Sequence, residues 1–323
     1  MKKLLAVMLG AAVLLSCGQM TAQGYPKKTV QIIVPVGAGG NVDFVARGIA
    51  RAPRSSLGQQ FIVENRPSAS SLVGTGVVAR AAPDGYTLLA MANTFAVAPS
   101  LVATPGYDPL KDFVGVSQTC WLPQILVVHP SLPVKTVKEL IEYGKAHPGE
   151  LTVANSGTGG TGHMVWELFN RHLGLRVVQV PYKGNAPALV DVVGGQAQVM
   201  FDTFSTSIQH VKAGKWRALA LASLKRSPIF PDLPTIAEAA NMPGFEASIF
   251  NGIMAPAATP RDILLRLQRE IATAVQNQEL RGRNLAQGVE LTASDSPEEF
   301  TEFVRQQYER YTKLIREVGI KAA

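Results

Sequence analysis

Short apolar runs alternate with helix-periodic stretches along most of this chain. The clearest example spans residues 29–47, where the run Thr-Val-Gln-Ile-Ile-Val-Pro-Val precedes Gly37-Ala-Gly-Gly40 and a helical pattern that begins at Asn41. A short β-branched run is typical of a strand buried on both faces, and Asn is a favoured helix N-cap. The glycine-rich turn would present backbone N–H groups and the positive end of a helix dipole. The stretch therefore predicts a strand, a turn that can hold an anion, and a helix.

The same alternation continues through the middle of the chain and predicts further buried strands with helices between them. The expected strands are residues 60–64, 86–91, 124–128, 151–154, 176–180, 198–201 and 217–222. Residues 104–113 are rich in Pro, Gly and Asp and are predicted to form a loop. Strands that alternate with helices are typical of a doubly wound parallel sheet, so the predicted fold class is α/β.

Two long amphipathic helices are predicted near the end of the chain, at residues 261–276 and 297–318. We expect them to return to the first lobe, which would leave two crossings and a cleft between two lobes. A chain of 323 residues that is 46% hydrophobic can form two lobes of roughly 100 to 150 residues each. The predicted division is a signal peptide at 1–24, lobe 1 at 25–121 and 236–323, and lobe 2 at 122–235.

The first 24 residues have the architecture of a secretory signal. Lys2 and Lys3 precede an apolar core at residues 4–15, followed by small and polar residues. This core is shorter than the roughly 20 apolar residues that span a bilayer. The sequence therefore predicts export to the periplasm.

Two ways of processing this segment stay open. Ala22-Gln23-Gly24 offers small residues at the spacing of a cleavage site, while Leu14-Leu15-Ser16-Cys17 resembles a lipoprotein signal. Leu15 departs from the smaller residue usual there. The exported protein would diffuse freely in the first case and would be tethered to a membrane through Cys17 in the second.

Cysteine content and charge exclude several kinds of function. Beyond Cys17 the chain has only Cys120, so no intramolecular disulfide is expected, and Cys120 is interpreted as a buried residue and not a nucleophile. The formal charge is +7, of which Lys2 and Lys3 contribute two. The basic residues are scattered, with few aromatic residues between them. Nucleic acid is therefore not an expected partner, and the charge only mildly favours anionic ligands.

Four strand-to-helix turns carry the candidate chemistry. They are residues 37–41, 67–71, 155–162 and 182–185, two in each predicted lobe. In a doubly wound sheet such turns lie at the carboxyl ends of the strands, where ligands bind. A single glycine-rich turn often reflects only a need for positive φ, but four turns facing one cleft predict a binding site.

Catalytic and cofactor motifs are weak or missing. Gly37-Ala-Gly-Gly40 lacks the third glycine of a dinucleotide fingerprint, and only Glu64 supports that alternative. The sequence contains no P-loop and no G-x-S-x-G elbow, and its five histidines are scattered without a metal-ligand pattern. We predict no catalytic residue, no metal and no cofactor. An enzyme that uses a nucleotide or phosphorylated substrate at the same turns is the alternative.

Three single residues near the turns allow two interpretations each. His163 is expected to cap or pack a helix more readily than to act as a base. Lys183 would either attract an anion or be a solvated loop charge. Asp202, at the end of a predicted strand, would either accept a hydrogen bond from a ligand or cap the next helix.

Motifs spread along the chain together resemble one family. They are Pro35 with Gly39-Gly40, Asp43 and Arg47; Val63-Glu-Asn-Arg-Pro67; Ala82-Pro-Asp-Gly-Tyr-Thr-Leu-Leu89; Val180-Pro-Tyr-Lys-Gly184; Gly194-Gly-Gln196 with Phe201-Asp202; and Pro231-x2-Pro-Thr-x2-Glu238. This order resembles the Bug family, the extracytoplasmic solute receptors of tripartite tricarboxylate transporters. The resemblance implies a type II periplasmic-binding-protein fold, whose two α/β lobes close on a small carboxylated solute. It also implies that backbone amides, hydroxyls and bridging waters hold the carboxylate.

The resemblance implies ligand contacts at the turns. In lobe 1 these are Ala38, Gly39, Gly40, Asn41, Val42, Ser68, Ala69, Ser70 and Ser71; in lobe 2 they are Ser156, Gly157, Thr158, Gly159, Gly160, Thr161, Lys183, Gly184, Asn185 and Asp202. Two departures leave the ligand open. The family usually has Gly-Ala-Gly-Gly at 68–71, where serines narrow backbone access and add hydroxyl donors, and Pro-Thr at 41–42, where Asn-Val removes one hydroxyl.

The predicted function is that of a non-enzymatic receptor. It would capture a small mono-, di- or tricarboxylate, aromatic or amino-acid carboxylates included, and deliver it to the membrane permease subunits of a tripartite tricarboxylate transporter. The protein would act as a monomer. The alternative partner is a sensor kinase to which the receptor presents its bound solute.

Overall fold

The structure is a computed structural model that describes residues 24–52, 56–158, 160–182, 185–227 and 230–320. The predicted signal segment lies outside these ranges except for Gly24, and so does Cys17. In the described ranges, none of the helices combines the length and the apolar character that crossing a membrane requires.

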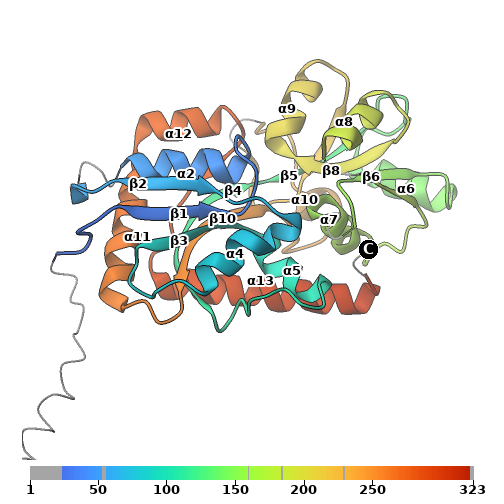
Figure 1. Ribbon diagram of the computed structural model, residues 1–323. Coiled ribbons are helices and arrows are strands. Elements are labelled where there is room, and N and C mark those ends of the chain that lie inside the picture. Colours follow the sequence, from blue (N-terminus) through green and yellow to red (C-terminus); the bar gives the residue numbers. More distant parts are fainter. Residues whose placement is uncertain (1–23, 53–55, 159, 183–184, 228–229, 321–323) are drawn as a thin grey trace, which may run out of the picture.

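Two β-sheets form the centres of two lobes (Figure 1). The strands of the first sheet are, in spatial order, β11 (Glu290–Leu291), β4 (Phe113–Leu122), β10 (Ile249–Pro256), β3 (Thr87–Ala92), β1 (Val30–Val34) and β2 (Phe61–Asn65). The strands of the second sheet are β7 (Val178–Pro181), β6 (Thr152–Asn155), β8 (Val199–Thr203), β5 (Gln124–Val128) and β9 (Arg217–Leu221). The predicted α/β class with two lobes is confirmed.

Each sheet is mixed and not wholly parallel. Strand β1 runs parallel to β2 and β3, and β6 runs parallel to β7 and β8. Strand β5 is antiparallel to β8 and β9, and β10 is antiparallel to β3 and β4. Both β5 and β10 are the first strands that the chain forms after crossing from one sheet to the other. The crossings therefore account for these antiparallel pairs, while β11 forms a further antiparallel pair with β4. The parallel strands keep their carboxyl ends at one edge of each sheet.

Helices cover both faces of the first sheet. Helices α2 (Asn41–Arg51), α11 (Arg261–Gln276) and α12 (Gln278–Leu285) pack on one face, and α4 (Leu72–Ala79), α5 (Thr94–Leu101) and α13 (Pro297–Val318) pack on the other. On the first face, Ile263, Leu267 and Ile271 of α11 contact the buried side chains of β1 and β3, as their helical spacing predicted. The short 3-10 turn η1 (Ala69–Ser71) precedes α4.

The second sheet is covered in the same way. Helices α6 (Val137–Ala146), α7 (Thr161–Asn170) and α10 (Ile236–Ala239) pack on one face, and α8 (Asn185–Val193) and α9 (Phe204–Lys212) pack on the other. Trp166, Phe169 and Phe201 form the centre of the first of these clusters. The side chain of Trp166 is therefore part of the core.

The point at which the chain returns to the first lobe is marked by packing. Ile236, Phe245 and Ala247 belong to the hydrophobic cluster of the second sheet, and the Ala247 N–H donates to the carbonyl oxygen of Ala222 at 2.8 Å. The sequence-based division assigned residues 236–247 to lobe 1. We propose instead that lobe 2 extends to Ala247 and that β10 begins the return.

Helix α13 links the lobes along one side of the molecule (Figure 1). Its residues Tyr311, Leu314 and Ile315 pack together with Met164 of α7 and with α5. Near the same end, Arg171 forms an ion pair of 2.8 Å with Glu317. The helix that was expected to return to the first lobe thus also contacts the second.

Candidate functional site

The glycine-rich turn at residues 37–40 connects β1 to α2 and is exposed along its length. Gly39 has a φ of +82°, a conformation that glycine adopts without strain. Helix α2 begins at Asn41, but Gly40 and not Asn41 occupies the N-cap, and no side chain caps the helix. The first backbone N–H groups of α2 are thus not engaged by a cap.

The shape of this turn is held by the buried carboxylate of Asp43. It accepts hydrogen bonds from the Gly39 N–H at 2.9 Å, from Arg47 Nε at 3.0 Å and from Asn65 Nδ2 at 2.9 Å. Burial alone would raise the pKa of Asp43, but these donors together lower it below its ordinary value. The charge of Asp43 therefore positions the turn and does not face a ligand.

The second turn of the first lobe adopts an uncommon backbone conformation. Ser70 and Ser71 have φ values of 53° and 63°, in the left-handed region that favours glycine. The Ser68 hydroxyl accepts a hydrogen bond from the Val73 N–H at 2.9 Å, so it satisfies a group at the start of α4. The serines thus keep a conformation suited to glycine, and Ser68 is engaged by the backbone.

The first turn of the second lobe is closely packed against its neighbours. The side chain of Asn155 accepts a hydrogen bond from the Gly157 N–H at 3.0 Å. A Cβ atom on Gly157 would lie 3.1 Å from the Tyr182 carbonyl oxygen, and one on Gly162 would lie 2.6 Å from the Phe201 carbonyl oxygen. The turn that begins at Asn155 therefore lies against Tyr182, which follows β7, and against Phe201 of β8.

Asp202 is buried and fully engaged with protein donors. Its Oδ1 accepts from Asn185 Nδ2 at 2.9 Å, and its Oδ2 accepts from the hydroxyls of Thr206 and Ser207, each at 2.6 Å. The expectation that Asp202 caps the next helix is not met, because the N-cap of α9 is Thr203 and no side chain caps it; Asp202 instead binds the hydroxyls of the first turn of α9. Its contact with Asn185 also fixes the start of α8.

The two groups of turns are connected by Asn93, which sequence reasoning missed. Asn93 follows β3 and is buried, and its Nδ2 donates to the Thr161 hydroxyl in the second lobe at 3.3 Å. It also lies beside the Tyr311 hydroxyl. The signal that could have identified it is a polar residue directly after a buried strand, which is the reasoning applied to Asp202.

Side-chain capping divides the helices into two groups. The N-cap residues of α2, α4, α5, α7 and α9 form no side-chain capping hydrogen bond, although Ser68 accepts from the Val73 N–H of α4. Helices α6, α10, α12 and α13 are capped by Thr136, Thr235, Asn277 and Ser296. These five helices follow the strands β1, β2, β3, β6 and β8. Helix α11, which begins after Pro260, is also uncapped. The uncapped starts of α5 and α7, one from each lobe, meet where Asn93 contacts Thr161. An uncapped helix start leaves backbone N–H groups of the kind that bind anions.

The predicted ligand-contact residues differ in how far their side chains are exposed to a ligand. Val42 packs its side chain into the core, so only its backbone is available to a ligand. Thr158 is exposed, and Ser156 and Thr161 are half-buried. Gly159, Lys183 and Gly184 lie outside the described residues, and Ala69 is described only in its backbone.

His163 and Cys120 have no exposed reactive position. Burial lowers the pKa of His163, an effect that Glu167 at 3.6 Å opposes. Burial also raises the pKa of Cys120 to about 12, with neighbouring hydrogen-bond donors only partly offsetting it. No group of three His, Cys, Asp or Glu residues suited to a metal ion occurs in the part of the chain that the structure describes.

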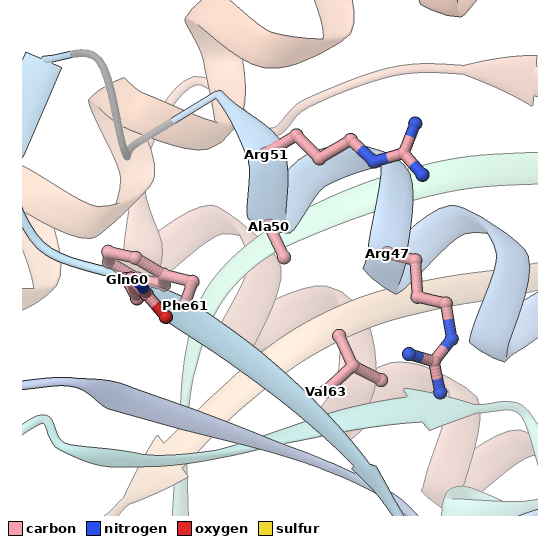
Figure 2. Close-up of a pocket in the computed structure, with 6 residues that line it drawn as sticks. All are labelled: Arg47, Ala50, Arg51, Gln60, Phe61 and Val63. Carbon is pink, nitrogen blue, oxygen red and sulfur yellow. The ribbon is translucent and has the colours of Figure 1, made fainter.

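A separate pocket of about 230 Å³ lies between α2 and the edge strand β2. Figure 2 shows its lining, formed by Arg47, Ala50, Arg51, Gln60, Phe61 and Val63. The Arg47 guanidinium is engaged by Asp43 and by Asn65 Oδ1, the latter at 2.8 Å. None of the four predicted turns lines this pocket, so it does not belong to the candidate site.

Comparison with known proteins places this chain in a family. The family model described as "Tripartite tricarboxylate transporter family receptor" matches residues 45–320. Protein BugT of Bordetella pertussis is 36% identical over 304 residues, which cover 94% of this chain and 93% of BugT.

Two solved structures share both fold and sequence with this chain. The periplasmic binding protein BugD is 35% identical, with a TM-score of 0.75 over 93% of this chain and 100% of that chain. Rpa4515 of R. palustris, solved with adipate, is 34% identical, with a TM-score of 0.78 over 93% of this chain and 100% of that chain. This chain therefore belongs to the family of receptors of tripartite tricarboxylate transporters.

Proposed function

We propose that this receptor holds a small carboxylate at the turns of residues 38–42, 68–71, 156–161 and 183–185. The observation that carries the proposal is the set of uncapped helix starts from both sheets, joined by the contact between Asn93 and Thr161. Backbone N–H groups at a helix start can bind an anion without a charged side chain.

The ligand class is supported by charge as well as by relatives. The nearby carboxylates Asp43 and Asp202 are engaged with protein donors. Asp43 takes the Gly39 N–H of the turn, so the N–H groups proposed for a ligand in this turn are those at the start of α2. The related protein Rpa4515 was solved with adipate, a dicarboxylate. We extend this class to the present receptor, with mono- and tricarboxylates included.

Binding would act by drawing the lobes together. Contacts come from both lobes, so a ligand that touches both stabilises the conformation in which they meet. The receptor would then deliver its solute, as a monomer in the periplasm, to the permease subunits of the transporter. It would carry out no reaction on the solute.

A titration with a matched pair of variants tests the proposal. Isothermal titration would measure the affinity of the purified exported protein for aliphatic, aromatic and amino-acid carboxylates, with nucleotides as the rival class. Gly40 has a φ of −76°, and a Cβ there would approach only the Gly37 carbonyl oxygen, at 3.7 Å. The Gly40→Val variant should therefore fold. Its valine side chain should block the access of a ligand to the first N–H groups of α2.

The control is Gly282→Val, because a Cβ on Gly282 of α12 meets no atom within 4 Å. We expect Gly40→Val to weaken carboxylate binding by at least about tenfold, the loss of roughly one charge-assisted hydrogen bond, and Gly282→Val to leave it unchanged. Carboxylate binding that survives Gly40→Val would contradict the assigned site. Binding of nucleotides alone would contradict the function.

A further inference from the structure

A buried polar cluster lies beneath the start of α2. Asn251 of β10 is 2% exposed and stands opposite Cys120 of β4 in the ladder. Side chains alternate along a strand, so Asn251 faces the same side of the sheet as Ile253, which packs with α2. Asn41, the first residue of α2, borders the same thiol. The cluster of Asn41, Cys120 and Asn251 is thus adjacent to the turn at 37–40.

Among the residues that the structure describes, three buried amide atoms of this cluster have no conventional hydrogen-bond partner. Within the described residues, neither Nδ2 nor Oδ1 of Asn251 forms a hydrogen bond, and neither does Oδ1 of Asn41, although all three atoms are buried. The amides approach the Cys120 thiol, but a thiol is only a weak donor and acceptor. Buried polar groups in proteins are almost always paired. These atoms therefore indicate a missing partner.

The missing partner has a defined chemistry. Asn251 Nδ2 needs an acceptor, while the oxygens of Asn41 and Asn251 need donors. Turning the Asn251 amide by 180° would exchange its oxygen and nitrogen. Because both atoms are unpaired, the site would still need one donor and one acceptor at Asn251. A carboxylate has only acceptors and can satisfy the nitrogen alone. A hydroxyl or amino group supplies the donor that the oxygens need.

We propose that Asn251 and Asn41 form a specificity subsite for a donor-bearing substituent next to the ligand carboxylate. The inference rests on the proposed function, in which the carboxylate binds at the N–H groups of α2. Asn41 belongs both to that helix start and to the buried cluster, so a substituent close to the bound carboxylate is the one that could reach the cluster. The receptor accordingly prefers 2-hydroxy or 2-amino carboxylates to their unsubstituted parents.

Ligand pairs that differ by one substituent test this preference in the unmodified protein. Isothermal titration would compare malate and aspartate with succinate, and 2-hydroxyadipate with adipate. We expect the hydroxy or amino carboxylate of a pair to bind at least about tenfold more tightly than the unsubstituted carboxylate. The unsubstituted ligand leaves the buried amide oxygens unpaired. Equal affinities within every pair would overturn the subsite and leave the proposed function standing. A protein that binds no carboxylate would overturn the proposed function itself.

Variants assign the preference to Asn251. Asn251→Leu keeps the number and branching of the side-chain heavy atoms and removes both amide groups. Asn251→Ser introduces a smaller side chain should the bulkier leucine variant fold poorly. Either variant should weaken binding of the substituted carboxylate and leave binding of the unsubstituted one unchanged. The ratio of the two affinities would then be close to one. Asn284→Leu is the control, because Asn284 of α12 is also buried with an unpaired Oδ1. A ratio that persists in both Asn251 variants, or that Asn284→Leu abolishes equally, would overturn the assignment.

Discussion

Asn93 donates from Nδ2 to the Thr161 hydroxyl over 3.3 Å, and this contact joins the end of β3 in one lobe to the start of α7 in the other. Each residue lies at an uncapped helix start. The contact therefore lies where the two halves of the candidate site meet, and its strength should bear on ligand affinity.

Replacing Asn93 with alanine should weaken ligand binding by about two- to tenfold, the value of one net hydrogen bond of roughly 0.5–1.5 kcal/mol. Isothermal titration with the preferred carboxylate would measure the change. Ser100→Ala is the control, since the Ser100 hydroxyl on the same helix contacts Thr312 at 2.6 Å within the first lobe. An equal loss of affinity in both variants would indicate a general effect of destabilising α5.

Asp43→Asn should lower the free energy of unfolding near pH 7 by about 2 kcal/mol, because it removes a charge that accepts several hydrogen bonds. The pKa of Asp43 is lowered in the folded protein, so its contribution is present above the unfolded pKa of about 3.9. It is lost as the pH falls through the folded pKa. Urea unfolding at pH 7 and pH 3 would measure the difference between the two proteins, which should shrink at the lower pH. A constant difference would show that the charge of Asp43 does not stabilise the turn.

Ser71→Gly should stabilise the protein slightly, by up to about 1 kcal/mol. The φ of Ser71 is 63°, a conformation that costs a non-glycine residue roughly 1–2 kcal/mol, while glycine loses about 0.5–1 kcal/mol through its more flexible unfolded state. Ser205→Gly, within α9, should instead destabilise the protein. Thermal unfolding of the two variants would show opposite shifts, and shifts of the same sign would contradict the strain at Ser71.

Gly162→Ala should destabilise the protein by about 1–3 kcal/mol, the usual cost of overpacking. The new Cβ would lie 2.6 Å from the Phe201 carbonyl oxygen, so α7 and β8 would have to separate. Gly37→Ala meets no atom within 4 Å and should change stability by less than about 0.5 kcal/mol. Denaturant unfolding would compare the two variants, and equal stabilities would show that the approach of α7 to β8 is not tight.

Local patterns predicted the strands and helices whose apolar spacing is regular. Helices α11 and α13 begin and end where the pattern placed them, and β5 also matches its predicted range. Strand β4 was missed, because its sequence alternates apolar with Gly, Ser, Gln and Thr although most of it is buried. Helix α5 was missed as well, since Pro99 and a run of small residues obscure its period.

The site was predictable where it depends on backbone and less so where it depends on tertiary contacts. Glycines that follow a buried strand predicted the turns, and the turn at 37–40 has the expected form. The roles of Asp43 and Asp202 as internal acceptors, and the contact of Asn93 with Thr161, depend on residues far apart in sequence. Strand order and side-chain pairing decide such contacts, and a single sequence contains no direct record of either.

The position of β10 has a consequence for how the chain acquires its shape. This strand lies between β3 and β4, yet it is formed by residues 249–256. The first sheet therefore stays divided until the last quarter of the polypeptide is present, whereas the strands of the second sheet lie within one continuous stretch. Contacts between distant segments form slowly because closing a long loop costs entropy. We expect the second lobe to fold first and the turn at 37–40 to gain its binding geometry only once β10 has joined the first sheet.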